Sequence, residues 1–330
     1  MTRPLPPAAE LAELVRSGQR MWLARAITLI ESRRPDHREQ AAELLTLLMP
    51  HTGGAQRIGL TGVPGVGKST FIDQFGTNLT ERGHQVAVLA VDPSSHRTGG
   101  AILGDKTRMV RLANDPKAFI RPSPSGVSLG GVTRTTRETI LLCEAAGYDV
   151  VIVETVGVGQ NETTVAEMVD IFVVLMLAGA GDELQGIKKG LLEIADLIAV
   201  NKADGDNVTR ARRAATDYRQ AIRLMTPASA SWVPPVLTCS AVEDTGLPEL
   251  WDEILRHRHV MSETGEREQR RKDQQLRWMW AMIGDRLVDE FRASSRVRKV
   301  LAAVERDVLA GTLPAAVAAD DLLATFLGDT

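Results

Sequence analysis

Several residue types are scarce in this chain of 330 residues, and each scarcity excludes a class of protein. Only two cysteines occur, Cys143 and Cys239, and they form no C-x-x-C pair, so we expect two small buried apolar side chains rather than a redox or metal site. The six histidines are scattered and form no metal-storage tract. The formal net charge is only −3 and no long basic block occurs, so the sequence does not predict a nucleic-acid-binding surface.

Long apolar runs are also absent. The longest, residues 171–180, is shorter than the roughly 20 residues that a membrane-spanning helix needs. Charged side chains near the start of the sequence are not typical of a signal peptide; they are Arg3, Glu10, Glu13 and Arg16. With 44% hydrophobic and 25% charged residues, the sequence predicts a globular protein of the cytoplasm that has no membrane partner.

What the sequence does contain is a phosphate-binding loop in the context that such a loop needs. The apolar run of residues 57–61 predicts a strand, and a helical pattern begins near residue 68. The pattern G-x-x-x-x-G-K-[ST] and the residue after it are Gly62, Val63, Pro64, Gly65, Val66, Gly67, Lys68, Ser69 and Thr70. Glycines let consecutive N–H groups turn toward a polyphosphate, Lys68 reaches the β- and γ-phosphates, and the Ser69 hydroxyl can ligate Mg²⁺. The sequence therefore predicts a nucleoside triphosphate as ligand.

The base is indicated by a second motif, Asn201-Lys202-Ala203-Asp204, which follows the strand pattern of residues 196–200. The Asp204 carboxylate can accept hydrogen bonds from the N1–H and the N2 amine of guanine together, whereas adenine presents a lone pair at N1. A polar helix cap after a strand is the alternative interpretation, because Asn and Asp favour such positions. The phosphate-binding loop upstream favours guanine.

Two acidic residues end predicted strands, and both are candidates for a magnesium site. Asp92 follows the run of residues 86–91, and Glu154 follows the run of residues 149–153. A carboxylate at a strand end beside the phosphate-binding loop can hold Mg²⁺ directly or through water. The alternative for each acid is a helix cap or a turn. We expect the N–H of Gly157 to sense the γ-phosphate, so that the segment after it responds to the nucleotide.

Two further loops carry candidate residues. Residues 96–108 are glycine-rich, and Asp105 within them is either a carboxylate associated with Mg²⁺ or a solvated loop acid. Residues 179–189 precede a helical pattern and contain Lys188 in a lysine pair, which is commonly a solvated charge. From the residues alone, both alternatives stay open.

Short β-rich runs alternate with helical patterns from residue 57 to about residue 258, which predicts an α/β fold whose mainly parallel sheet has helices on both faces. The predicted strands are residues 57–61, 86–91, 118–121, 149–154, 171–177, 197–201 and 236–239. The predicted helices between them are residues 68–82, 133–146, 188–195, 208–224 and 247–258. Ligands bind such sheets at the carboxyl ends of the strands, and the motifs above fall at those ends.

Helical patterns flank this region on both sides. We therefore divide the chain into an N-terminal helical segment (1–52), a P-loop domain (53–260) and a C-terminal helical segment (261–330). The N-terminal segment contains one apolar series from Leu11 to Ile30 and a second from Ala42 to Leu48.

The C-terminal segment contains an apolar stripe at helical spacing. Its residues are Leu276, Trp280, Ile283, Leu287 and Phe291. A second helix is predicted from about residue 297 to residue 309. The apolar stripe predicts either a homodimer interface or packing on the chain's own nucleotide domain, and we favour the homodimer.

Together these motifs resemble those of the MeaB/ArgK-type GTPases, which are methylmalonyl-CoA mutase-associated G-protein chaperones of the SIMIBI class with a P-loop NTPase fold. The likeness is carried by GVPGVGKST from Gly62, VDPSSHRTGGAILGDKTRM from Val91, RPSPSG from Arg121, VETVGVGQ from Val153, AGAGDELQGIKKG from Ala178 and NKAD from Asn201. The likeness extends over nearly the whole chain.

The resemblance implies a role for each candidate residue. It implies GTP and GDP as ligands, with base-reading residues at Asn201, Lys202 and Asp204 and a second base loop at Cys239, Ser240 and Ala241. It implies Mg²⁺ bound near Ser69, Asp92, Asp105 and Glu154, and catalytic roles for Lys68, Glu154, Asp105 and Lys188. The implied partner is an adenosylcobalamin-dependent methylmalonyl-CoA mutase, which communicates with the loop of residues 178–189. A second copy of the chain is the partner predicted by the apolar stripe.

The site differs from that of a Ras-like GTPase in ways that predict slow hydrolysis. The acidic motif uses Glu154 rather than Asp, Val158 stands where a water-orienting Gln is expected, and no arginine finger is evident. Hydrolysis is then expected to be slow until a partner completes the site, and the resemblance implies that this partner is the mutase. A phosphotransferase linked to amino-acid transport, as described for ArgK-type relatives, is the alternative function, although no acceptor-binding motif is visible. Metal delivery to a nickel enzyme is disfavoured because the sequence has no histidine tract.

Overall fold

The computed structural model describes residues 4–32, 34–91, 109–122, 129–155, 162–179, 185–225 and 229–328, with the backbone alone at 129–133 and 185–189. These residues form two compact units, and the division lies between Arg271 and Lys272. The three-part division expected from the sequence stays a prediction.

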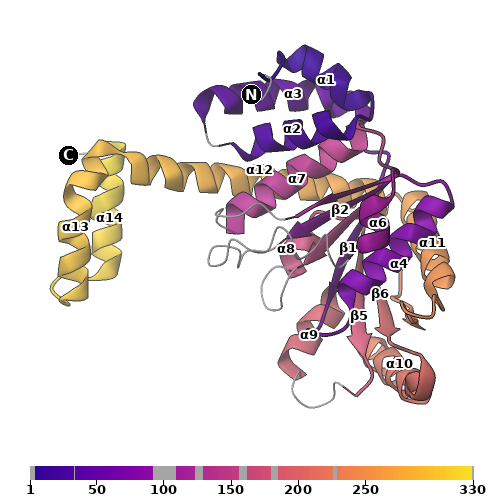
Figure 1. Cartoon of the computed structure of the whole chain (residues 1–330). Helices are drawn as coiled ribbons and strands as arrows, with labels where there is room; N and C mark the ends of the chain where they lie inside the picture. The colour runs from indigo at the N-terminus through magenta and orange to yellow at the C-terminus, as the bar shows by residue number, and fades with distance from the viewer. Residues whose placement is uncertain are drawn as a thin grey trace. The chain divides into compact units, whose positions relative to one another are not determined.

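A seven-stranded sheet forms the centre of the first unit, and its neighbouring strands pair in parallel in the order β3-β2-β4-β1-β5-β6-β7 (Figure 1). The strands are β1 Gln56–Gly62, β2 Val86–Val91, β3 Ala118–Arg121, β4 Val150–Thr155, β5 Ile171–Leu177, β6 Leu197–Asn201 and β7 Val236–Thr238. All seven predicted strands are confirmed. The strands β2, β4 and β6 are buried at every position, as expected for strands that are covered on both faces.

Helices cover both faces of this sheet. On one face, Ile58 and Leu60 of β1 pack in a cluster with residues of α4, α6 and α11. On the other face, Phe172 and Val174 of β5 pack in a second cluster with residues of α7, α8, α9, α10 and the N-terminal helices. The helices of these layers are α4 Lys68–Glu81, α6 Val110–Asn114, α7 Leu129–Ala145, α8 Glu162–Ala166, α9 Gln185–Ile194, α10 Val208–Arg223 and α11 Leu247–Glu263, with a 3₁₀ turn η3 at Gly205–Asn207. The predicted doubly covered α/β architecture is confirmed.

The N-terminal segment forms three helices, which are α1 Ala8–Arg16, α2 Arg20–Glu31 and α3 Pro35–Leu48, followed by a 3₁₀ turn η1 at Met49–His51. The first apolar series is divided between α1 and α2, because Gly18 interrupts the helix with φ +74°. The second series is shifted from its expected positions, since Ala41 and Leu44 are buried while Ala42 is exposed.

Helix α12 (Glu266–Ala293) crosses the division between the two units, and its part beyond Arg271 belongs to the second unit with α13 (Ser295–Leu309) and α14 (Ala315–Leu327). The ring of Phe291 packs edge-on against that of Phe326 with centroids 5.4 Å apart, which joins α12 to α14. Helix α14 was not expected from the sequence. Its composition is alanine-rich and apolar on most sides, so it lacks the periodic stripe that identifies a helix.

Within the described residues, none of the helices has the length and apolarity to cross a membrane.

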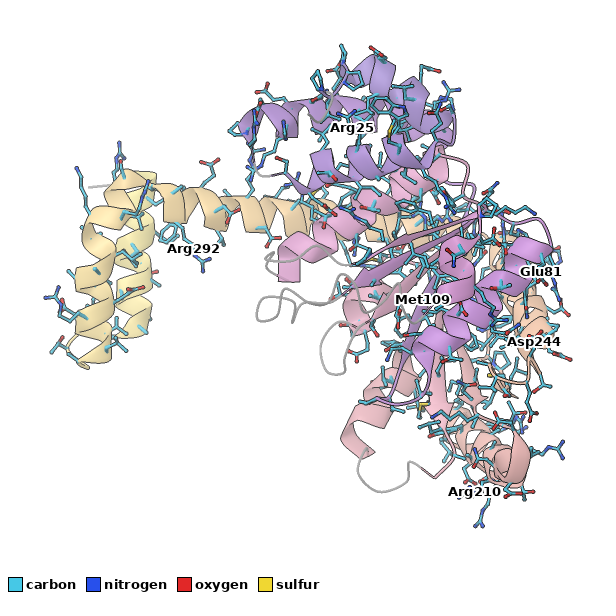
Figure 2. All side chains as sticks on the ribbon, in the orientation of Figure 1. Arg25, Glu81, Met109, Arg210, Asp244 and Arg292 are labelled. Carbon is cyan, nitrogen blue, oxygen red and sulfur yellow. The ribbon has the colours of Figure 1, made fainter. Side chains whose placement is uncertain are left out.

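Figure 2 shows the side chain of Arg210 extending from the outer face of α10, whereas Met109, at the start of α6, is buried.

Candidate functional site

The predicted phosphate-binding loop joins the end of β1 to the start of α4, as its motif requires. Gly67 has φ +90° and is the N-cap residue of α4, so the loop turns sharply before the helix begins. A Cβ atom on Gly62 would lie 2.6 Å from the carbonyl oxygen of Leu175 in β5 and 2.9 Å from the side chain of Val66. Glycine is therefore required at both positions, and the first N–H groups of α4 stay available for an anion.

Lys68 is the first residue of α4, and its Nζ donates a hydrogen bond to the carbonyl oxygen of Gly62 at 3.0 Å. Burial lowers the pKa of Lys68, and the negative charges of Glu154 and Glu162 oppose this shift. Both carboxylates therefore lie close enough to Lys68 to act on its charge. In the rest of the loop, Pro64, Gly65 and Thr70 are exposed, whereas Val63 and Val66 are buried.

Glu162 is a residue that the sequence analysis missed. It is the first residue of α8 and is buried, although acids at a helix start are usually exposed. The only signal in the sequence is an acid in the first turn of a helix, and that pattern is more often read as a charge that favours the helix dipole. Its position near Lys68 depends on the packing of α8 on β1, β4 and β5, which no local pattern specifies.

The predicted base-reading motif begins at the last residue of β6 and contacts the phosphate-binding loop. Asn201, the last residue of β6, donates from Nδ2 to the carbonyl oxygen of Val66 at 2.8 Å. Lys202 has φ +59°, which is uncommon for a residue with a side chain and is typical of functional sites. The Cε of Lys202 would lie 3.8 Å from a Cβ atom on Gly67, so the lysine side chain passes over the loop.

Asp204 is held by the second predicted base loop. The Ser240 hydroxyl donates to Oδ2 of Asp204 at 2.5 Å, and the same hydroxyl accepts from the N–H of Glu243 at 3.1 Å. A carboxylate oriented by a hydroxyl keeps its remaining lone pairs for a ligand with two donors. The structure thus brings Asp204 and Ser240 together from segments that are far apart in the sequence.

The neighbours of Ser240 complete this second loop. The N–H of Ala241 donates to Oδ1 of Asn201 at 3.3 Å, and the thiol of Cys239 lies 3.7 Å from the same oxygen. Burial raises the pKa of Cys239 to about 12, and Cys143 is buried as well. The expectation that both cysteines are buried apolar side chains is confirmed, and Cys239 acts here as a small packing group beside the base-reading residues.

The candidate metal ligands are only partly within the described residues. Ser69 lies in the first turn of α4, and Glu154 lies at the carboxyl end of β4, paired in register with Leu60 of β1. Glu154 is 4% exposed, and the hydroxyl of the next residue, Thr155, donates to that of Thr61 at 2.7 Å. Asp92, Asp105, Gly157 and the side chain of Lys188 lie outside the described residues, so their roles stay predictions.

The groups that are present fit a guanine nucleotide with its phosphates. One end of the site offers N–H groups at a helix start together with the Lys68 cation, which suit a polyphosphate. The other end offers the oriented Asp204 carboxylate, which suits the two donors of guanine. Glu154 and Ser69 add oxygen ligands of the kind that Mg²⁺ prefers.

Comparison with known proteins agrees with this site. The family model described as "Methylmalonyl Co-A mutase-associated GTPase MeaB" matches residues 23–296. A protein of Caulobacter vibrioides named "Putative GTPase" is 62% identical over 310 residues, which are 94% of this chain and 95% of that protein. A mouse protein named "Methylmalonic aciduria type A homolog, mitochondrial" is 47% identical over 319 residues, which are 94% of this chain and 77% of that protein.

A solved structure shows the same fold over the whole chain. The protein described as "LAO/AO transport system kinase" is 40% identical, and the superposition has a TM-score of 0.77 and covers 98% of each chain. The likeness of fold therefore includes the N-terminal and C-terminal helices as well as the sheet.

Proposed function

This chain belongs to the family of methylmalonyl-CoA mutase-associated GTPases MeaB, and we propose that it is an Mg²⁺-dependent GTP switch that serves an adenosylcobalamin-dependent methylmalonyl-CoA mutase. As a member of this family it is a GTP-hydrolysing enzyme. The proposed switch controls the loading of the cofactor onto the mutase and protects the mutase from inactivation. The names of the family and of the mouse relative support the connection to methylmalonyl-CoA metabolism. A cytoplasmic location stays a prediction.

The observation that carries the proposal is the orientation of Asp204 by Ser240, at 2.5 Å, beside the phosphate-binding loop. Asp204→Asn presents an amide donor where the carboxylate accepts, so preference should move from guanine to xanthine nucleotides. The measurement is competition of GTP, XTP and ATP for the purified protein. Asp206→Asn is the matched control, because Asp206 lies two residues further on in the exposed turn η3. Equal affinity of the unmodified protein for GTP and ATP would contradict the base assignment.

We propose that Mg²⁺ is held by Ser69 of α4, by Glu154 and Asp92 at strand ends, and by Asp105 of the loop of residues 96–108. The ion supplies charge stabilisation for the phosphates when it is bound. Glu154 keeps a buried negative charge near Lys68, which would favour the lysine in its protonated form beside the phosphates.

Partner stimulation is the second part of the proposal. The sequence motifs show no evident arginine finger, and Val158 stands where a water-orienting glutamine is expected, so basal hydrolysis should be slow and the mutase should accelerate it. We propose that Lys188 relays this effect. Lys188→Ala should leave basal hydrolysis nearly unchanged and remove the acceleration, while Lys299→Ala on the exposed face of α13 should change neither. A Lys188 variant that the mutase still accelerates fully would contradict the relay.

The apolar stripe of α12 supports the proposal that the chain forms a homodimer. Three of its residues are more than half exposed, namely Leu276 at 56%, Trp280 at 66% and Leu287 at 57%. Apolar side chains of this size gather at subunit interfaces, where a second copy buries them. Light scattering of the full chain tests this proposal, and Leu276→Glu combined with Leu287→Glu should give a monomer. If the full chain is a monomer, the homodimer proposal is wrong, and the stripe would instead pack within one copy of the chain.

A phosphotransferase of the ArgK type, linked to amino-acid transport, is the alternative function. The description of the 40% identical solved structure as a transport system kinase favours it. The two functions differ in the fate of the γ-phosphate. Incubation with GTP labelled at the γ-phosphate should release free phosphate and leave candidate acceptor proteins unlabelled if the chain is a switch.

A further inference from the structure

The amino ends of β1, β5 and β6 are joined by side chains that the proposed function does not use. These three strands carry the phosphate-binding loop, the loop of residues 178–189 and the base-reading motif at their carboxyl ends. Two aspartates lie at the opposite ends, Asp170 immediately before β5 and Asp196 immediately before β6. Both are buried, although an unpaired buried carboxylate costs several kcal/mol.

Each aspartate sets the pairing of two strands. The N–H of Asp170 donates to the carbonyl oxygen of Arg57 in β1 at 2.9 Å, and Oδ2 of Asp170 accepts from the N–H of Arg57 at 3.0 Å. In the same way, the N–H of Asp196 donates to the carbonyl oxygen of Phe172 in β5 at 2.9 Å, and Oδ2 of Asp196 accepts from the N–H of Phe172 at 2.8 Å. Each aspartate thus makes two hydrogen bonds with a single residue of the neighbouring strand, and a shift of the pairing by one residue would break both. The aspartates therefore fix the register of β1 with β5 and of β5 with β6.

Two consecutive arginines at the start of α12 hold these aspartates. Arg271 donates from Nε and Nη2 to the two carboxylate oxygens of Asp170, each at 2.6 Å. It also donates to the carbonyl oxygens of Gly53 at 2.6 Å and Ala55 at 2.9 Å, which precede β1. One guanidinium therefore joins the beginning of β1 to the beginning of β5.

Arg270 makes the corresponding connection between β5 and β6. It donates to both carboxylate oxygens of Asp196, each at 2.9 Å, and to the carbonyl oxygen of Asp170 at 2.6 Å. Burial alone would raise the pKa of Asp170, but the hydrogen bonds and charge of Arg271, together with the charges of Arg57 and Arg267, bring that pKa below its usual value. Asp170 is thus held as a charged acceptor, and the planar fork of arginine suits the orientation of both aspartate side chains.

We propose that Arg270 and Arg271 are positioning residues of the nucleotide site, because they set the relative placement of the three strands whose opposite ends carry its loops. The strands carry this effect over roughly 20 Å, at about 3.3 Å per residue. The inference rests on the proposed guanine nucleotide site and makes nucleotide affinity depend on the start of α12. Since such coupling is reciprocal, nucleotide binding also stabilises these arginine contacts.

The test compares Arg270→Lys and Arg271→Lys with Arg20→Lys. Lysine keeps the positive charge that the buried aspartates need but cannot make the forked contact. Arg20 is a matched control because its guanidinium, from α2, binds the carbonyl oxygens of Asp115 and Ala118 at the start of β3, an edge strand that carries none of the proposed nucleotide residues. The probe is a fluorescent GDP analogue, with the thermal midpoint of each full-length variant measured beside its Kd.

Both α12 variants should bind the analogue roughly tenfold more weakly, which lies within the usual range for linked sites, and Arg20→Lys should bind it as the unmodified chain does. Hydrogen exchange provides a second readout. GDP should slow exchange of the Arg57 and Phe172 amides in the unmodified chain and have less effect on them in the α12 variants. Unchanged Kd values in folded α12 variants, or an equal loss in Arg20→Lys, would overturn the inference. If the unmodified chain fails to bind GDP at all, the proposed nucleotide site is wrong instead.

Discussion

The carboxyl and amino ends of the same three strands, β1, β5 and β6, carry very different polar side chains. At the carboxyl ends, Lys68 donates to a main-chain carbonyl and Asp204 accepts from a hydroxyl, so neither charge is matched by a forked ionic contact. At the amino ends, Asp170 and Asp196 are each bound by both arms of an arginine. At the carboxyl ends, the charges of Lys68 and Asp204 remain available to interact with a ligand. At the amino ends, each carboxylate is already paired with an arginine of the same chain.

One sheet therefore serves both ligand binding and stability, at opposite ends of its strands. A site that binds a charged ligand keeps incompletely matched groups, which lowers the stability of the free protein. A buried network with matched charges and satisfied hydrogen bonds holds the strands in place, and it becomes costly only when one partner is removed. The following predictions separate the two ends, in order of decreasing effect.

The largest effect is expected from comparing two C-terminal truncations, one that ends before residues 266–271 and one that ends after them. A chain that ends at residue 265 loses Arg267, Arg270 and Arg271, so Asp170 and Asp196 lose the arginines that balance their charges and keep only their main-chain N–H donors. Each uncompensated charge costs about 3–5 kcal/mol, so two of them should exceed what a domain of ordinary stability tolerates. A chain that ends at residue 275 keeps the arginines and should fold and bind GTP.

Circular dichroism and nucleotide binding of the two shortened chains are the measurements. A chain ending at residue 265 that folds and binds GTP as well as the longer one would show that the arginines are not needed. That result would contradict the proposed difference between the ligand-binding carboxyl ends of the strands and their stabilising amino ends.

Next in size is the loss of nucleotide binding in Lys68→Ala. Removal of the Lys68 ammonium leaves the negative charges of Glu154 and Glu162 beside the place proposed for the phosphates, without the opposing cation. We expect no productive nucleotide binding by titration calorimetry. Lys117→Ala is a matched control, since Lys117 also donates from Nζ to a main-chain carbonyl oxygen, that of Thr80, at 3.0 Å. Comparable losses in the two variants would indicate a general effect of lysine removal on stability.

A smaller effect is expected from Glu154→Gln, which keeps the shape of the side chain and removes its charge. Nucleotide binding should persist, and Mg²⁺-dependent hydrolysis should fall by about 10²–10³, as is typical for one well-placed electrostatic group. Single-turnover hydrolysis at several Mg²⁺ concentrations measures this. Glu31→Gln removes the carboxylate that binds Arg121 and serves as the control. Unchanged turnover in Glu154→Gln would remove this residue from the site.

The smallest effect concerns the loss of folding stability at acid pH that arises from His257, which lies near Asp196 at the amino end of β6. His257 of α11 is buried, with its ring 4.8 Å from that of Trp232 and its Nε2 4.0 Å from Asp196. Burial lowers the pKa of His257 to about 4, below the value of about 6.5 expected in the unfolded chain. Between these two values the unfolded chain binds a proton that the folded chain does not, so stability falls as the pH falls through this window.

At about 1.4 kcal/mol per pKa unit, His257 should account for roughly 2 kcal/mol of the stability lost between pH 7 and pH 5. His257→Phe should therefore lose less stability over this interval than the unmodified chain in urea unfolding. His259→Phe is the control, because His259 lies on the exposed side of the same helix. The same loss in both variants would show that His257 does not titrate in this way.

Much of the carboxyl-end site could be predicted because its motifs are continuous in the sequence. The phosphate-binding loop and the base-reading quartet each occupy a few adjacent residues after an apolar run, and parallel strands bring such segments to one edge of the sheet. Glu162 escaped prediction because its proximity to Lys68 depends on how α8 packs. Nothing in the sequence singled out Arg270 and Arg271 at the start of α12, since helical periodicity does not reveal which carboxylate an arginine will meet.

The sequence by itself determined the α/β fold, the seven strands, the phosphate-binding loop and the guanine motif, because each depends on residues that are adjacent or regularly spaced. Tertiary structure alone decided which charges are buried together. Arg271 and Asp170 are 101 residues apart, and Arg270 and Asp196 are 74 apart, yet each pair makes a forked contact. The desolvation of such charges favours pairing only once the strands and α12 have packed, so the partners are chosen by the fold and not by any local pattern.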